Sequence, residues 1–266
     1  QENRPRVFFK RREYMITTIE ITGEKNKARF IKRLNRFEVL AECGGETVLC
    51  HVANTGRMKE LLVPGREVIL RRAKNPDRKT KWDLIIAYTI DGVPVFLESV
   101  MANRLILKAL KEGKLKEFQG WADIKREAAY GNSRFDVRLS DSGLGSDGTD
   151  SSLPHCFLEI KCVTLVEEGS AKFPDAPTER GTKHVLELMK AKAAGLNAAV
   201  IVVAQREDAK SFTPNRETDP VFSEAIAMAA KAGVKVYAYR CSVTTSQISL
   251  LGRIPVYLDP ADLQGV

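Results

Sequence analysis

Apolar and polar residues alternate along short segments between residues 29 and 97. Because a period of two places successive side chains on opposite faces of a strand, this pattern predicts β-structure. Turn signals such as Gly44-Gly45 and Asp91-Gly92 separate neighbouring segments. The expected strands are 29–34, 37–43, 46–52, 66–72, 82–90 and 93–97. Short strands with no long helix among them predict a small OB-fold barrel, in which residues 54–61 could form the capping helix.

The pattern changes after residue 98, where apolar positions recur with helical spacing. Helices are expected at 99–112, 178–194 and 219–232, and a glycine follows each of the last two. Strands are expected at 124–130, 134–140, 156–163, 198–204 and 235–240. The segment 198–204 is apolar throughout, which is typical of a parallel strand covered on both faces. The second region is therefore predicted to be a mixed α/β domain.

This division gives four parts. Residues 1–14 are interpreted as an extension, because Met15 could be a genuine start. Residues 15–97 form the predicted barrel, residues 98–258 the mixed α/β domain, and residues 259–266 a tail. The Ser-, Gly- and Asp-rich stretch 141–152 is expected to be a flexible surface insertion.

Two expected strands of the second region carry its candidate chemistry. Asp136 points away from the apolar face of strand 134–140, and Glu159 and Lys161 point together away from the apolar face of strand 156–163. If these strands pair, burying two carboxylates is costly unless a cation lies between them. Two carboxylates that bind a divalent metal, with a lysine near an attacking water, are what phosphodiester hydrolysis needs. The alternative is an ordinary salt bridge on an exposed strand face.

Positive charge is concentrated in the first third of the chain. The net charge is +8; residues 1–95 hold 20 Lys and Arg against 12 Asp and Glu, whereas residues 96–266 hold 22 of each kind. This distribution favours a module that binds a polyanion. A loop between two expected barrel strands contributes six basic residues, and the adjacent Trp82 could stack on a base. These candidates for DNA phosphate contacts, or for a solvated surface, are Arg71, Arg72, Lys74, Arg78, Lys79 and Lys81.

The composition also limits the class of protein. A hydrophobic content of 44% and a charged content of 29% are typical of a soluble globular chain. No apolar run approaches the length of a membrane-spanning helix, so no membrane partner is expected. The five cysteines are odd in number and lack a Cys-x-x-Cys pair, which favours free thiols in the reducing cytoplasm.

Asp136 on one strand, then Glu159-x-Lys161 on the next strand and a helix after it, resembles the PD-(D/E)XK nuclease superfamily. More specifically, nearly the whole chain from about residue 28 resembles the SfsA family (sugar fermentation stimulation protein A). The matching segments are 51–56, 102–105, 127–131, 134–136, 158–165 and 173–184. The resemblance implies an N-terminal OB-fold, a C-terminal nuclease-like domain, non-specific DNA binding and a regulatory role in sugar metabolism, especially that of maltose. It does not settle whether DNA is cleaved.

With this resemblance, Asp136, Glu159 and the backbone carbonyl of Ile160 are hypothesised to bind Mg²⁺ or Mn²⁺ through oxygen. Lys161 is expected to act on the attacking water or on the charge that develops on the phosphate. Glu127, on the strand before Asp136, is a secondary catalytic candidate, with a surface carboxylate as the alternative.

Other cations are candidates for phosphate contacts. Arg180, Lys183 and His184 share one face at the start of the helix 178–194, where the helix dipole also favours an anion. Arg57 follows Asn54-Thr55-Gly56, which either forms a turn or exposes amides to a phosphate. Asp175 and Glu179 are possible outer metal ligands.

Three functions remain open from the sequence. The first is a metal-dependent nuclease that binds DNA, single- or double-stranded, through its barrel. The second is a non-specific DNA-binding protein without catalysis, and the third is an RNA-processing factor. No helix-turn-helix signature is present, which argues against a sequence-specific repressor. The oligomeric state is open, with a homodimer among the possibilities.

Overall fold

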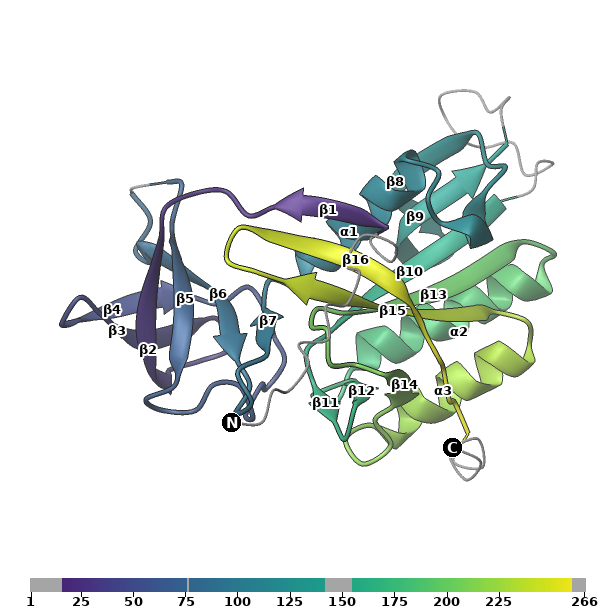
Figure 1. Cartoon of the computed structure of the whole chain (residues 1–266). Helices are drawn as coiled ribbons and strands as arrows, with labels where there is room; N and C mark the ends of the chain where they lie inside the picture. Colours follow the sequence, from purple (N-terminus) through teal and green to yellow (C-terminus); the bar gives the residue numbers. More distant parts are fainter. Residues whose placement is uncertain (1–15, 76, 142–154, 260–266) are drawn as a thin grey trace, which may run out of the picture.

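The computed structural model describes residues 16–75, 77–141 and 155–259. The chain forms two domains side by side, a β-barrel and a larger α/β domain (Figure 1). The predicted extension at residues 1–14, most of the predicted insertion and nearly all of the predicted tail lie outside the described residues.

The barrel follows the alternating segments of the sequence. Its strand order is β4-β3-β2-β5-β6-β7, and a parallel pairing of β4 with β6 closes it. Inward-facing apolar residues such as Val39, Leu70 and Leu84 are fully buried and form its core. The strands are β2 (Lys25–Arg33), β3 (Glu38–Cys43), β4 (Glu46–His51), β5 (Glu67–Arg72), β6 (Trp82–Tyr88) and β7 (Pro94–Phe96).

A seven-stranded sheet of order β1-β16-β15-β13-β10-β9-β8 forms the centre of the second domain. Its middle strands β10, β13 and β15 are parallel, and the apolar β13 lies between the other two, as its composition predicts. The strands are β1 (Thr17–Glu20), β8 (Asp123–Tyr130), β9 (Ser133–Ser140), β10 (His155–Val163), β13 (Asn197–Ala204), β15 (Lys235–Val243) and β16 (Gln247–Ile254).

Helices cover both faces of this sheet (Figure 1). Helix α1 (Val100–Lys111) packs its buried leucines against one face, where Leu158 and Ile201 lie. Helices α2 (Glu179–Ala193) and α3 (Pro220–Lys231) cover the other face. The smaller elements are the 3-10 helix η1 (Lys116–Phe118) and a three-stranded sheet of β11 (Val166–Glu167), β12 (Ser170–Phe173) and β14 (Ser211–Pro214).

The predicted order of barrel first and mixed α/β domain second is confirmed. Three details differ from the sequence-based expectation. Residues 54–61 form turns rather than a capping helix. Strand β1, which the sequence placed with the barrel, pairs with β16 in the sheet of the second domain. The sequence-based expectation also did not include β16 or the small sheet, whose strands have only two to four residues.

Among the described residues, no helix is long and apolar enough to cross a membrane.

Candidate active site

The two strands that carry the predicted site pair and then diverge. Strands β9 and β10 are antiparallel neighbours, and their register ends at Leu158 opposite Val137. Beyond that pair, the side chain of Asp136 takes the place of a ladder partner: its Oδ2 accepts a hydrogen bond from the backbone N–H of Ile160 at 2.7 Å. The carboxylate therefore lies between the separating strands, next to Glu159.

The other oxygen of Asp136 faces helix α1. Asn103 donates its Nδ2–H to Asp136 Oδ1 at 2.7 Å. Both oxygens of this carboxylate are thus held by neutral donors, one from a strand and one from a helix, and its orientation is fixed.

Glu159 is buried, with an exposed fraction of 4%. Its Oε1 accepts hydrogen bonds from Lys161 Nζ and from His184 Nδ1, both at 2.6 Å. Its Oε2 is buried and has no hydrogen-bond partner among the described residues. A carboxylate oxygen without a partner in such a place is unusual, because burying an unsatisfied acceptor costs about 1–3 kcal/mol.

The two carboxylates have opposite electrostatic surroundings. Burial and the nearby charge of Glu159 raise the pKa of Asp136 to about 6. Burial also opposes ionisation of Glu159, but hydrogen bonds from His184 and Lys161 outweigh it and lower the pKa of Glu159. Lys161 compensates part of the charge of the pair, but ionisation of Asp136 as well as Glu159 remains unfavourable without a further positive charge.

The residues present fit a divalent cation. The free Glu159 Oε2 and the adjacent Asp136 supply two oxygen donors. Mg²⁺ commonly uses one or two carboxylates and keeps several waters. No group of three or more His, Cys, Asp and Glu that could hold a metal occurs among the described residues, so water or substrate would have to complete the coordination.

Glu127 lies on the edge strand β8. In the pairing of β8 with β9, Arg126 lies opposite Val137 and Ala128 lies opposite Phe135. Glu127 is therefore at the level of Asp136 on the neighbouring strand. Its backbone has a φ of 50°, a left-handed conformation that is uncommon for a residue other than glycine. Its side chain is exposed.

A cleft of about 1650 Å³ lies between the two domains. Residues 54–56 of the barrel line one side, and the start of α2 lines the other. Asn103, Ile160 and Lys161 line it as well, and each hydrogen-bonds Asp136 or Glu159. The carboxylate pair therefore lies directly behind the residues that line the cleft.

The three basic residues predicted to share a helix face lie in two different environments. Arg180 and Lys183 are exposed and line the cleft, and Lys183 also donates to the backbone carbonyl of Asn132. His184 is instead buried, 6% exposed, and bound to Glu159, so it cannot contact a phosphate as the sequence suggested. Arg57 is exposed at the edge of the barrel.

The possible outer ligands lie in the cleft as well. Asp175 accepts a hydrogen bond from the backbone N–H of Met58 at 2.7 Å, and burial raises the pKa of its carboxyl group. It thus connects the two domains. Glu179 is exposed in the first turn of α2.

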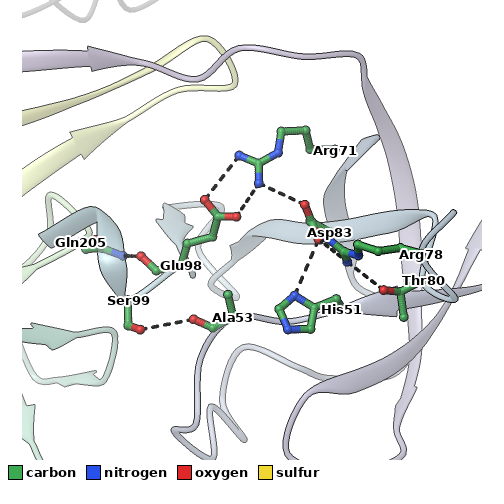
Figure 2. A network of polar contacts seen from close by, with 9 residues as sticks. All are labelled: His51, Ala53, Arg71, Arg78, Thr80, Asp83, Glu98, Ser99 and Gln205. Carbon is green, nitrogen blue, oxygen red and sulfur yellow. Dashed lines mark hydrogen bonds and ion pairs between the residues drawn. The ribbon is translucent and has the colours of Figure 1, made fainter. Parts of the chain in front are cut away.

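The basic loop of the barrel is largely committed to internal contacts (Figure 2). Arg71 lies between Asp83 and Glu98, at the junction of the domains, and Arg78 donates to Asp83 at 2.8 Å. Lys79 pairs with Glu38 at 3.0 Å. The exposed members of the loop are Arg72, Lys74, Lys79 and Lys81.

The proposed stacking role of Trp82 does not fit its position. Its side chain is 8% exposed and belongs to the barrel core, and the guanidinium of Arg72 lies 5.3 Å from its ring centroid. A base therefore has no open ring face to stack on from the solvent.

Comparison with known proteins agrees with the fold of both domains. The family model described as "SfsA N-terminal OB domain" matches residues 31–97, and the one described as "Sugar fermentation stimulation protein RE domain" matches residues 100–247. The chain belongs to the SfsA family. It is 47% identical over 232 residues to the sugar fermentation stimulation protein homolog of Clostridium tetani, covering 87% of this chain and 96% of that relative. It is 45% identical over 240 residues to the homolog of Alkaliphilus metalliredigens, covering 90% and 99%.

A solved structure of the SfsA protein of Pyrococcus furiosus in complex with Ca²⁺ has a TM-score of 0.76 and 27% identity. The match covers 90% of this chain and 98% of that chain. The predicted family and the predicted architecture are thus confirmed: an OB-type barrel is followed by a mixed α/β domain, in which Asp136 and Glu159-x-Lys161 lie on adjacent strands.

Two site residues of this SfsA-family chain were not assigned to the carboxylates from the sequence. Asn103 and His184 lie on helices, 33 residues before Asp136 and 25 residues after Glu159 respectively. Both fall within the segments that carry the family resemblance, which is the one signal that pointed to them. Residue spacing could not reveal the contacts, because they depend on how the helices pack on the sheet.

Proposed function

We propose that this protein is a DNA-binding phosphodiesterase that uses Mg²⁺ or Mn²⁺ held between Asp136 and Glu159. The observation that carries the proposal is the buried, unpartnered Glu159 Oε2 beside a second carboxylate whose pKa is raised to about 6. Both features are relieved when a divalent cation binds. The relative from Pyrococcus furiosus supports the proposal, because its structure holds Ca²⁺, a hard cation that takes carboxylate and carbonyl oxygens.

DNA is proposed as the substrate on chemical grounds. The barrel belongs to a fold that commonly binds oligonucleotides, and the first third of the chain holds the whole excess of positive charge. Contacts of this kind involve the phosphate backbone rather than base edges, so binding is proposed to be independent of sequence.

In the proposed reaction, the oxygen of a water molecule attacks phosphorus and gives up a proton to the surrounding water, the bond to the leaving oxygen breaks, and the leaving oxygen takes up a proton from the surrounding water. When bound, the cation supplies electrostatic stabilisation of the charge on the phosphate. Lys161 lines the cleft with a side chain that is 13% exposed, and its ammonium is held by Glu159. Its proposed role is to stabilise the same developing charge. Asn103 and the Ile160 N–H keep Asp136 in its orientation during the reaction.

Incubation of supercoiled plasmid DNA with Mg²⁺ or Mn²⁺ tests the proposal. The parent protein should nick the plasmid, and Asp136→Asn should not, because the amide removes a charged ligand while keeping the shape of the side chain. Equal nicking by both proteins would reveal a contaminant, and absence of nicking with either metal would eliminate the proposed reaction.

The alternative is a DNA-binding protein that does not cleave. One observation favours it: Lys161 and His184 already pair with Glu159, so part of its charge is compensated without a metal. A regulatory link to sugar or maltose metabolism rests on the family name, and no residue of the site accounts for it. Binding of DNA by both the parent and Asp136→Asn without cleavage by either is the expected result for this alternative.

A further inference from the structure

Exposed apolar side chains line the cleft between the domains. Among the described residues, seven large hydrophobic side chains are exposed, and three of them line this cleft. Val100 is 53% exposed, Leu186 39% and Val221 64%, and they come from the starts of α1 and α3 and the middle of α2. Apolar side chains that line a cleft commonly contact its ligand.

Uncommitted positive charges lie on opposite sides of the same cleft. Arg36 belongs to the turn between β2 and β3 of the barrel, and Arg180 belongs to the first turn of α2. Both side chains are exposed, and neither guanidinium has a hydrogen-bond or ion-pair partner within the described residues. Each can therefore contact a phosphate without giving up an internal contact.

A hydrogen bond and a close approach connect the two sides of the cleft. Asp175 of the second domain accepts from Met58 N–H of the barrel at 2.7 Å. Gly56 of the barrel lies close to the same carboxylate, since an added Cβ would lie 3.0 Å from Asp175 Oδ2.

We propose that this cleft binds single-stranded DNA, with phosphates between Arg36 and Arg180 and unpaired bases against Val100, Leu186 and Val221. A duplex presents phosphates outward and keeps its base faces stacked inside, so it would leave the apolar residues without a partner. A single strand offers phosphates for the two arginines and exposed base faces that can pack against the aliphatic side chains. The proposal rests on the proposed function, because the strand would reach Asn103, Ile160 and Lys161 in front of the carboxylate pair.

The basic loop of the barrel is the competing location. Arg71 and Arg78 are already paired with carboxylates there, and no exposed large apolar residue belongs to residues 71–75 or 77–81 of the loop. The loop therefore lacks both features that the cleft combines.

Binding can be measured separately from cleavage by fluorescence anisotropy, with a labelled oligodeoxythymidine and a duplex of equal length. The protein is Asp136→Asn without added metal, so that no substrate is lost. Arg36→Ala and Arg180→Ala should each weaken single-strand binding several-fold and reduce the salt slope by about 0.7, the value for one phosphate contact on a single strand. Leu186→Ser should weaken binding without changing the slope. Arg72→Ala, in the loop, is the matched control and should change neither.

The outcomes separate this proposal from the proposed function. Equal or tighter binding of the duplex, or a loss in Arg72→Ala with none in the cleft variants, would overturn the single-strand cleft even if the parent protein cleaves DNA. Conversely, a parent protein that cleaves no DNA with Mg²⁺ or Mn²⁺, but whose cleft variants lose single-strand binding as described, would support the cleft and remove the phosphodiesterase.

Discussion

Substitution of His184 perturbs the site without replacing a proposed metal ligand. Its Nδ1 lies 2.6 Å from Glu159 Oε1, and its ring packs edge-on against Phe135, with centroids 6.0 Å apart. It thus holds one oxygen of Glu159, so that the other oxygen, Oε2, remains available to the proposed cation. Replacing His184 with alanine leaves Lys161 to hold Oε1 alone among the described residues, which should loosen the orientation of the carboxylate and weaken metal binding.

The magnitude follows from the hydrogen bond that is lost. A hydrogen bond to a charged group contributes about 1.5–3 kcal/mol, and each 1.4 kcal/mol is about tenfold in affinity. Groups that orient metal ligands typically change affinity by about 10–100-fold when removed. We therefore expect His184→Ala to raise the dissociation constant for Mn²⁺ about tenfold or more, as measured by electron paramagnetic resonance titration of free Mn²⁺ in the absence of DNA.

Two further variants separate orientation from general loss of packing. His184→Asn places an amide N–H close to the position of Nδ1 and should recover most of the Mn²⁺ affinity. Val185→Ala, the next residue of α2 and fully buried, should lower stability but leave Mn²⁺ affinity unchanged. If His184→Ala binds Mn²⁺ as tightly as the parent, or if the asparagine variant is as weak as the alanine variant, the orienting role is wrong.

Three other changes test the energetics of the structure by urea unfolding. Because the pKa of Asp136 is raised to about 6, its ionised form destabilises the metal-free protein. Asp136→Asn should therefore stabilise it at pH 8 by up to about 3 kcal/mol, and this stabilisation should disappear as the pH falls from about 6 to 4. Equal unfolding free energies of the two proteins at pH 8 would refute the prediction. Gly56→Ala should be destabilising because its Cβ would lie 3.0 Å from a carboxylate oxygen, whereas Gly252→Ala, with nothing within 4 Å, should change stability little. Arg71→Ala leaves the buried carboxylates of Asp83 and Glu98 without their shared partner and should lower the free energy of unfolding by about 3 kcal/mol. Arg72→Ala should lower it by about 1 kcal/mol or less. Similar losses in the two variants would contradict a stabilising role of the Arg71 ion pairs.

The sequence predicted the parts of the site that depend on local geometry. Period-two alternation placed Glu159 and Lys161 on one face of a strand, and the structure joins their side chains at 2.6 Å. The way in which Asp136 reaches Glu159 could not be predicted, because it depends on where the β9–β10 register ends. Nor could the sequence place His184, since burial of one residue on a helix that also carries exposed cations depends on the packing of that helix.

The basic loop shows a different limit. A count of cations along the sequence makes Arg71 and Arg78 candidates for phosphate contacts. Such a count cannot show that carboxylates elsewhere in the fold already pair with them. Asp83 lies on the following strand and Glu98 at the domain junction, and both become neighbours of Arg71 when the barrel closes. Two charges that remain uncommitted, Arg36 and Arg180, lie far apart in the sequence, and the fold brings them to the same cleft.

Asp136 serves the fold and the proposed chemistry together, which decides how its variants must be interpreted. Its carboxylate accepts from Ile160 N–H and from Asn103, two donors that the diverging strands and α1 leave without another acceptor. Asp136→Ala removes both acceptors. The Asn103 amide lines the cleft and can turn to water, but the Ile160 N–H loses its acceptor between the strands, which costs about 1–3 kcal/mol. Asp136→Asn keeps an acceptor for Ile160, and the amide of Asn103 can turn to present its oxygen to the new N–H₂ group. The alanine variant should thus be the less stable of the two at pH 8 by a few kcal/mol in urea unfolding, and loss of activity in it would report partly on structure. Equal unfolding free energies for the two variants would contradict this double role of Asp136.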